Sequence, residues 1–290
     1  MKTPTKIILT LLLSLIFINQ SFAFTRGIYI SQDTALDKAK MAYLIRESKK
    51  HGIDTFVIDV NGQGKSYAAS VKNVIQQGIH YVARIVIFPH GGTHAQVTDK
   101  NIWAKRLNLA KYAVGLGATS IQLDYIRFQS SYPADPQKAK HILKVVEYFK
   151  NELSRYHVAL QMDIFGIAAL KPAHTIGQDA GALANVVNVF CPMVYPSHYE
   201  PFREHAIHPY ETILKSVVAL KKQLFNHPAV SVYPYIELFN YRYPLTPEQK
   251  IKYINAEMKA VRDSGANGWY VWSATNHYAP LFRILSGKSL

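Results

Sequence analysis

The chain has 290 residues, and 33 lysines and arginines against 19 aspartates and glutamates give it a formal net charge of +14 at pH 7. Cys191 is the only cysteine, which excludes an internal disulfide, so a hydrophobic core of the size that this length allows has to stabilise the fold. The charge favours anionic partners, but the basic residues are scattered and no nucleic-acid-binding motif is present, so we expect no nucleic acid partner.

The first predicted element is an export signal. Two lysines precede the apolar run IILTLLLSLIFI, and the small residues Ser21 and Ala23 follow it. This order is typical of a cleavable signal peptide, here residues 1–23. The run is too short to indicate a stable membrane span, and no later segment qualifies. We therefore expect a secreted or periplasmic monomer whose single domain covers residues 24–290.

Strand-like runs of apolar, β-branched and aromatic residues follow at intervals. In chain order they are 27–31, 55–60, 81–88, 120–128, 158–166, 186–196, 230–239 and 268–274. Segments with helical periodicity fill most of the gaps between them. Thr246 begins a capping box, and Gly52, Gly117 and Gly265 stand where helices should end.

Eight alternating units of this length predict an α/β fold of the (β/α)₈ TIM-barrel type in a single domain. The alternative is an open doubly wound sheet. No Gly-x-Gly-x-x-Gly follows the first strand, and polar residues inside the strands fit a lined barrel mouth better than a flat buried sheet.

The fourth and fifth runs carry the same Gln-x-Asp pattern, as Gln122 with Asp124 and Gln161 with Asp163. Because side chains alternate across a strand, each Gln shares a face with its Asp. A helical segment separates the two runs, so the strands should be parallel neighbours and the two carboxylates should converge at their ends. Acid–base hydrolysis of a glycosidic bond needs such a pair.

Two further carboxylates belong to the same predicted mouth, where TIM barrels carry their active sites. Asp59 closes the second run and Glu237 lies near the end of the seventh. Repulsion among crowded carboxylates raises the pKa of at least one, which suits a general acid. We assign Asp124 as nucleophile or base and Asp163 as general acid, with Glu237 as its rival and Asp59 as a substrate contact. The alternative role for each is a salt bridge or a helix cap.

Two arginines are placed near these carboxylates. Arg127 follows Asp124 closely and could pair with a mouth carboxylate if the strand ends there. Arg84 lies inside the third run, where an unpaired charge would be costly, so we expect it to form a structural pair with Asp59 or Asp124.

Aromatic side chains gather near the same strand ends, and sugar rings stack on aromatic faces. They are Tyr125, Phe128, Tyr195, Tyr199, Tyr235, Trp269, Trp272 and Tyr278. Trp272 is the expected stacking platform, and Tyr195, His198, Tyr235 and Arg127 complete the expected substrate contacts. The alternative is that several of these rings only pack between strands and helices.

Histidines also fall in the predicted mouth loops, at His90, His94, His198 and His277. His90 and His94 have a spacing compatible with a metal pair, but the glycines between them argue against the helix that would align them. We expect these side chains to bind substrate, and we expect neither a metal nor a cofactor.

The segments QLDYIRF, MDIFG, MVYPSHY and WYVWSATNHY resemble a family of bacterial glycoside hydrolase domains with a predicted TIM barrel. The likeness runs from Gly27 to about Phe282. It implies a carbohydrate-active barrel with Asp124 in the site and Asp163 as its partner. The family usually has an amide where this chain has Glu237, and its loop after the second strand is usually more acidic than residues 61–64. The resemblance therefore does not extend a catalytic role to Glu237.

The sequence thus predicts an exported glycoside hydrolase that cleaves a polysaccharide or oligosaccharide, an anionic one being compatible with the charge. One alternative is a non-catalytic glycan-binding barrel that keeps the aromatic mouth. Another is a metal-dependent polysaccharide deacetylase that uses the histidines.

Overall fold

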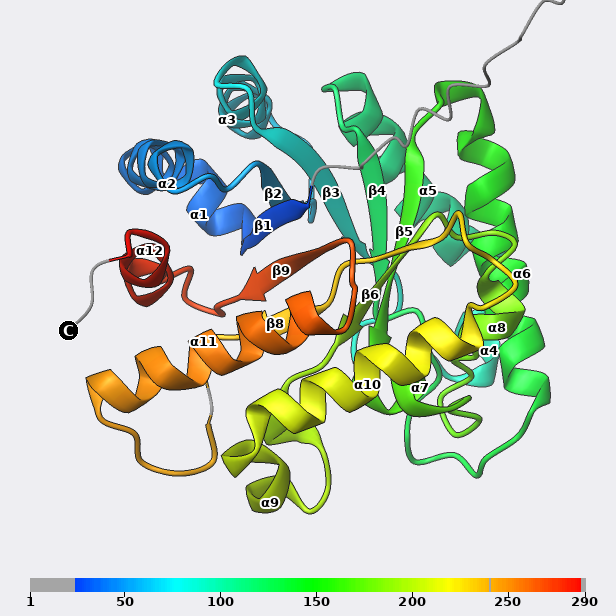
Figure 1. Cartoon of the computed structure of the whole chain (residues 1–290). Coiled ribbons are helices and arrows are strands. Elements are labelled where there is room, and N and C mark those ends of the chain that lie inside the picture. The colour runs from blue at the N-terminus through cyan, green and yellow to red at the C-terminus, as the bar shows by residue number, and fades with distance from the viewer. Residues whose placement is uncertain (1–23, 240, 288–290) are drawn as a thin grey trace, which may run out of the picture.

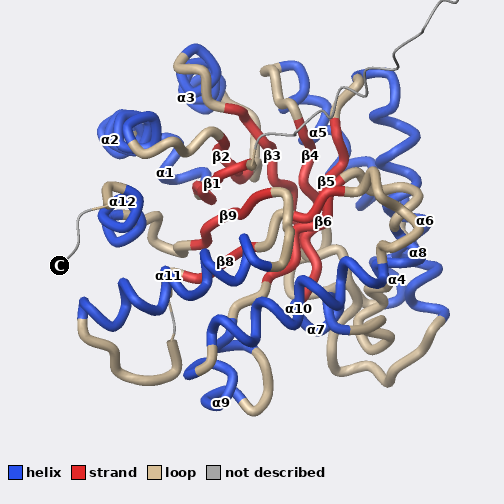
Figure 2. The backbone as a smooth tube through the Cα atoms, viewed as in Figure 1, coloured by secondary structure: helices blue, strands red, loops and turns tan. Residues whose placement is uncertain are grey.

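The computed structural model describes residues 24–239 and 241–287, and the expected signal peptide at residues 1–23 lies outside these residues. The described chain forms a closed barrel of parallel strands surrounded by helices (Figures 1 and 2). The strands are β1 (Thr25–Ile30), β2 (Thr55–Asp59), β3 (His80–Val86), β4 (Ser120–Asp124), β5 (Ala159–Phe165), β6 (Val189–Met193), β7 (Ser231–Val232), β8 (Tyr235–Glu237) and β9 (Gly268–Trp272).

The strand order confirms the predicted TIM barrel. Sheet neighbours run β5-β4-β3-β2-β1-β9-β8-β6, and β6 pairs with β5 to close the ring. The seventh predicted run is split into β7 and β8, and both pieces pair with β6. Pro234 stands between them, and a proline has no backbone N–H to donate to a ladder. The two pieces together occupy the seventh of the eight strand positions.

The helices cover the outside of the barrel (Figure 2). They are α1 (Gln32–Leu36), α2 (Lys38–Lys50), α3 (Lys65–Gln76), α4 (His94–Thr98), α5 (Lys100–Gly115), α6 (Gln137–Leu153), α7 (Gly166–Leu170), α8 (Ala180–Leu183), α9 (Phe202–Ile207), α10 (Pro209–Gln223), α11 (Pro247–Asp263) and α12 (Ala279–Leu285), with 3₁₀ turns η1 (Ser154–Tyr156) and η2 (Pro196–His198). The capping box at Thr246 begins α11 as predicted. No helix in residues 24–239 and 241–287 is long and apolar enough to cross a membrane.

The barrel interior is small and partly polar. Gln122 and Gln161 face each other across β4 and β5, and Gln122 Nε2 donates to Gln161 Oε1 at 3.2 Å. The Tyr235 hydroxyl donates to Gln122 Oε1 at 2.9 Å, and the Tyr270 hydroxyl donates to Gln161 Oε1 at 3.2 Å. The glutamines of the repeated pattern therefore fill the barrel, and each aspartate stands two residues further along its strand, towards the mouth.

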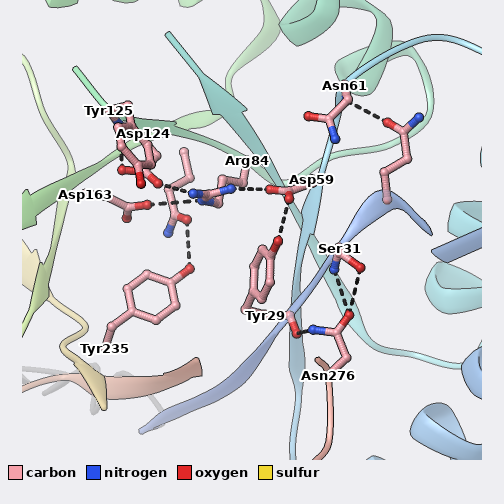
Figure 3. Close-up of polar contacts among 12 residues, drawn as sticks. Tyr29, Ser31, Asp59, Asn61, Arg84, Asp124, Tyr125, Asp163, Tyr235 and Asn276 are labelled. Carbon is pink, nitrogen blue, oxygen red and sulfur yellow. Dashed lines mark hydrogen bonds and ion pairs between the residues drawn. The ribbon is translucent and has the colours of Figure 1, made fainter. Parts of the chain in front are cut away.

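Asn276, which follows β9, ties the first strand of the barrel to the last. Its Nδ2 donates to the carbonyl of Tyr29 at 3.1 Å, and its Oδ1 accepts from the backbone N–H of Ser31 at 3.0 Å (Figure 3). β1 and β9 are direct neighbours in the sheet (Figure 1). These contacts fix the C-terminal ends of β1 and β9, where Tyr29 and Trp272 approach the mouth.

Candidate active site

Arg84 lies at the centre of the barrel mouth and links three carboxylates (Figure 3). Its Nη1 donates to Asp59, its Nη2 donates to Asp124, and its Nε lies 3.6 Å from Asp163 Oδ2. The side chain is only 4% exposed. Burial alone would lower the pKa of Arg84, but the surrounding carboxylates, Asp124 first, raise it well above its usual value. The predicted pairing of Arg84 with Asp59 or Asp124 is confirmed for both partners, and Asp163 is added.

Asp163 is the most deeply enclosed of the three carboxylates, at 1% exposure. Burial raises the pKa of Asp163 well above its usual range, and the negative charge of Asp124 raises it further. Arg84 offsets only part of this effect. Among the described residues, no hydrogen-bond partner reaches Asp163 Oδ1. Burial and the negative charge of Asp124 therefore both favour the protonated form of the Asp163 carboxyl group.

Asp124 ends β4, and the chain changes direction immediately after it. Tyr125 has a φ of 50°, in the left-handed region that non-glycine residues seldom occupy, and its N–H donates to Asp124 Oδ1. One oxygen of Asp124 thus caps the turn while the other accepts from Arg84. Both oxygens of the carboxylate are therefore hydrogen-bonded at the strand end.

Asp59 is fixed from two sides. Its Oδ2 accepts from the Tyr29 hydroxyl at 2.6 Å, and its Oδ1 accepts from Arg84. The Tyr29 ring stacks on Trp272 with centroids 3.7 Å apart and planes 20° apart. Like Asp163, Asp59 is not among the described residues that line the mouth cavity, and its contacts orient Arg84 and Tyr29.

A cavity of about 780 Å³, the mouth cavity, opens beside Arg84 and Asp124. Its lining includes the predicted site residues Asp124, Arg127, Tyr195, His198 and Trp272. Further lining residues lie at or after the C-terminal ends of β4, β5, β6 and β8. They are Tyr125, Phe165, Gly166, Ile167, Leu170, Met193, Tyr199, Glu200, His205, Lys215 and Phe239. Asp163 is adjacent to the described lining through Arg84 but does not belong to it.

Several of these lining residues were not predicted as site residues. Phe165 ends β5 two residues after Asp163, and Glu200 directly follows the segment MVYPSHY, so position in the chain could have identified both. Lys215 lies in the middle of α10 and reaches the mouth only because α10 packs against α7. No local sequence signal marks it.

Some predicted contacts lie elsewhere. Tyr235 lies in the barrel interior and hydrogen-bonds Gln122. Phe128, Trp269 and Tyr278 are buried in the core between strands and helices. His94 begins α4, with its ring 4.9 Å from that of Phe128, and is not among the residues that line the mouth cavity. Among the described residues, no group of three or more His, Cys, Asp or Glu side chains is placed to hold a metal ion.

The prediction that Arg127 pairs with a mouth carboxylate is wrong, because Arg127 forms no ion pair among the described residues. Its guanidinium lies 4.7 Å from the ring centre of Phe165 and 5.6 Å from that of Tyr125, and Nη1 donates to the Phe128 carbonyl at 2.9 Å. The strand does end at Asp124, but the left-handed turn at Tyr125 directs Arg127 towards the next loop.

Glu237 lies behind the wall of the mouth cavity, fully buried. Its carboxylate accepts from the Ser197 N–H at 3.0 Å and from the Ser197 hydroxyl at 2.6 Å. The same hydroxyl lies 2.9 Å from Nδ1 of His198, which lines the cavity. Glu237 therefore holds the loop that carries His198, and it is separated from the carboxylates around Arg84.

Replacing Glu237 with glutamine should remove part of the pH dependence of stability. Burial raises the pKa of Glu237 to about 7. Between its unfolded value and about 7 the folded state then binds more protons, so this group's contribution is present at low pH and is lost as the pH rises through 7. From pH 5 to pH 8 the free energy of unfolding of wild type should therefore fall by about 3 kcal/mol through this group. Glu237→Gln should not show this fall.

Urea unfolding at both pH values measures this effect. Glu211→Gln, at an exposed position in the first turn of α10, is the matched control and should keep the wild-type profile. Identical pH profiles for wild type and Glu237→Gln would contradict the assigned role of this carboxyl.

A closed parallel barrel with an acidic cluster and an aromatic cavity at the C-terminal ends of its strands has its candidate site where TIM-barrel enzymes carry their active sites. Residues 89–278 match the model of a family described as "Putative glycosyl hydrolase domain", and the chain belongs to this family. The family resemblance seen in the sequence is thereby confirmed. A comparison with curated protein sequences found no match.

Solved structures of the same fold include carbohydrate-active enzymes. The PgaB (BpsB) glycoside hydrolase domain from Bordetella bronchiseptica superposes with a TM-score of 0.64 at 13% identity, over 92% of this chain and 100% of that one. The spore cortex-lytic enzyme SleL of Bacillus cereus gives 0.64 at 12% identity, over 91% and 74%. A chitinase from Chromobacterium violaceum gives 0.62 at 10% identity, over 90% and 98%. At these identities the likeness establishes the fold.

Proposed function

We propose that this protein is an exported enzyme that hydrolyses a glycosidic bond of a polysaccharide or oligosaccharide. The observation that carries the proposal is the pairing of Asp124 and Asp163 on one guanidinium. Asp124 lines the mouth cavity and is ion-paired to Arg84, whereas Asp163 has a raised pKa and an oxygen without a partner. A carboxylate that faces the cavity, next to a carboxyl group whose pKa is raised, is what acid–base glycoside hydrolysis requires.

In the proposed reaction Asp124 attacks the anomeric carbon while Asp163 gives its proton to the leaving oxygen. Water then hydrolyses the glycosyl–enzyme ester, and the proton that it loses returns to Asp163. The two carboxylates stand on adjacent strands and contact the same side chain, which favours the short spacing of retaining enzymes, about 5–5.5 Å, over the long spacing of inverting enzymes, about 6.5–9.5 Å. We therefore expect retention of configuration.

The experiment that tests this proposal incubates the mature protein with a panel of neutral and acidic bacterial polysaccharides and measures new reducing ends. Proton NMR of the first product formed reports its anomeric configuration. If a glycan binds with micromolar affinity but no reducing ends appear at any pH from 4 to 8, the protein is a glycan-binding barrel. If a chelator abolishes the activity and acetate is released, it is a deacetylase.

Trp272→Ala should weaken substrate binding more than it slows the reaction. One face of Trp272 is covered by Tyr29, and the half-buried ring lines the mouth cavity beside Arg84. Stacking acts alike on ground state and transition state, so it changes KM rather than kcat. We expect KM to rise about tenfold, a loss of about 1.4 kcal/mol, with kcat nearly unchanged.

Tyr29→Phe is the control for this prediction, because it keeps the ring that supports Trp272 and removes the hydrogen bond to Asp59. A fall in kcat for Trp272→Ala with unchanged KM would show that Trp272 acts by holding Tyr29 and Asp59 in place. The platform role would then be wrong.

The proposal also places the protein outside the cytoplasm as a monomer with one domain. The support for export is the sequence of residues 1–23, which has the order of a signal peptide. N-terminal sequencing of the secreted or periplasmic protein should begin at Phe24. Recovery of the intact N-terminus from a membrane fraction would overturn this part of the proposal.

A further inference from the structure

A second cavity of about 470 Å³, the side cleft, lies next to the mouth cavity. The two cavities share Arg127, Phe165 and Ile167 as lining residues. The rest of the side cleft is formed by Ser130, Ala134, Lys171, Pro172, Ala173, His174, Thr175 and Ile176. A glycan whose bond is cleaved beside Asp124 can therefore continue past Arg127 into the side cleft.

The two loops that form the side cleft are fixed to each other. Lys138, only 1% exposed, donates from Nζ to the carbonyl of Pro133 at 2.6 Å and to that of Thr175 at 2.7 Å. The Asp135 N–H donates to the carbonyl of His174 at 3.2 Å. The cleft is therefore shaped before any ligand arrives, which lowers the entropic cost of binding.

The side cleft carries positive charge without a balancing carboxylate. Arg127, Lys171 and His174 contribute to its lining, and no aspartate or glutamate is among its described lining residues. Neither Arg127 nor Lys171 forms an ion pair with any described residue. Arg127 Nε and His174 Nδ1 are buried and have no hydrogen-bond partner in the described chain. Buried polar atoms without partners are costly unless a ligand or water satisfies them.

Arg127 is held in position before any ligand binds. Its guanidinium lies over Phe165, and Nη1 donates to the Phe128 carbonyl. Gly91 packs so closely against it that a Cβ there would lie 2.7 Å from Nη1, and the φ of Gly91 is +89°. A fixed, planar guanidinium with a free edge matches a carboxylate, and the apolar wall at Ile167, Pro172 and Ile176 suits the face of a sugar ring.

We propose that the side cleft is a subsite for a sugar residue that carries a carboxylate, held by Arg127 and Lys171. This inference rests on the proposed function, because it takes the mouth cavity as the place of cleavage. Under this proposal the substrate is an acidic polysaccharide, and the side cleft is the site that recognises its carboxylate. The full sequence has a net charge of +14, or 14 − 2 = +12 without Lys2 and Lys6 of the expected signal peptide, which adds a long-range attraction for the same polymer.

Ligand-observed NMR titration tests the subsite without requiring turnover. The probes are methyl β-D-glucuronide and methyl β-D-glucoside, which have the same ring and differ in the carboxylate. Wild type should bind the glucuronide at least about tenfold more tightly, as a charge-assisted contact predicts. The preference should shrink in high salt, because Lys171 is exposed.

Two variants locate the effect. Lys171→Met keeps the aliphatic stem and removes an exposed charge, and Arg127→Met removes the half-buried guanidinium at the shared wall. Each should reduce the preference for the glucuronide to about threefold or less, whereas Lys105→Met, an exposed lysine on α5, should leave it unchanged. Because Lys171 is on the surface, its variant stays informative even if Arg127→Met fails to fold.

Equal affinity of wild type for the two probes would overturn the proposal, as would a preference that survives in both Lys171→Met and Arg127→Met. If the protein prefers the glucuronide but hydrolyses no glycan, the subsite is supported and the proposed hydrolysis is overturned. If the protein hydrolyses a neutral glycan and shows no preference for the glucuronide, the hydrolysis is supported and the subsite is overturned.

Discussion

Asp124→Asn is expected to lower kcat/KM by about 10³- to 10⁴-fold while the barrel remains folded. Asparagine keeps the shape of the side chain at the end of β4 but cannot attack the anomeric carbon. The substitution removes one of three carboxylates around one guanidinium, so Asp59 and Asp163 still surround Arg84. Steady-state kinetics on the substrate found by the polysaccharide panel measures the effect, and circular dichroism checks the fold.

Asp163→Asn should be the second inactive variant, and its defect should depend on the leaving group. A substrate with an acidic aryl leaving group needs no proton, so the loss of rate should be much smaller for an aryl glycoside than for the polysaccharide. Stability should change little, because asparagine resembles the protonated Asp163 that the raised pKa implies. An equal loss on both substrates would contradict the role of proton donor.

Glu200→Gln is the matched comparison for Asp163→Asn. Glu200 is exposed and is the other carboxylate besides Asp124 among the described residues that line the mouth cavity. If Asp163 is the donor, Glu200→Gln should keep wild-type kcat on both kinds of substrate. If Glu200→Gln instead shows the leaving-group dependence and Asp163→Asn stays active, the proton comes from Glu200 and the Gln-x-Asp pairing does not describe the catalytic pair.

Arg84→Met should be the most destabilising single change at the mouth, at about 3–5 kcal/mol. Arg84 is the shared ion-pair partner of Asp59 and Asp124, and all three side chains are buried. Methionine fills much of the same space but leaves two buried carboxylates without a counter-charge. The loss should be larger at pH 8 than at pH 5, because at the lower pH protons can neutralise the unpaired carboxylates.

Urea unfolding at the two pH values measures the effect of Arg84→Met. Arg46→Met, which removes an exposed ion pair with Glu47, is the control and should cost less than about 1 kcal/mol. If Arg84→Met were as stable as wild type at pH 8, the guanidinium would not be the group that offsets the cost of burying these carboxylates.

The sequence determined the barrel and the face of each repeated side chain. Alternation along β4 and β5 placed Gln122 with Asp124 and Gln161 with Asp163, and both pairs lie as predicted, with the glutamines in contact and the aspartates at Arg84. This succeeded because the period of two in a strand is a local property of the backbone. The split of the seventh strand at Pro234 changed its pairing but not its position in the ring.

The prediction was less complete where the strands end. Alternation alone put Glu237 at the mouth, but β8 ends at this residue and its carboxylate contacts Ser197 and Tyr253 instead. Arg127 was expected near a carboxylate, and the left-handed turn at Tyr125 places it on the side cleft. Beyond the last strand residue the backbone no longer has a fixed period, so the direction of a side chain depends on the turn.

What the sequence by itself determined is therefore the set of residues that strands carry to the mouth: Asp59, Arg84, Asp124, Asp163 and Trp272. Only the tertiary structure decided how they interact, because the raised pKa of Asp163 and the three-way contact of Arg84 depend on burial and on distances between strands far apart in the chain. The tertiary structure also decided which charged residues outside the strands line the two cavities. Lys171, Lys215 and Glu200 carry no periodic signal, and they reach the two cavities only through the packing of loops and helices around the closed barrel.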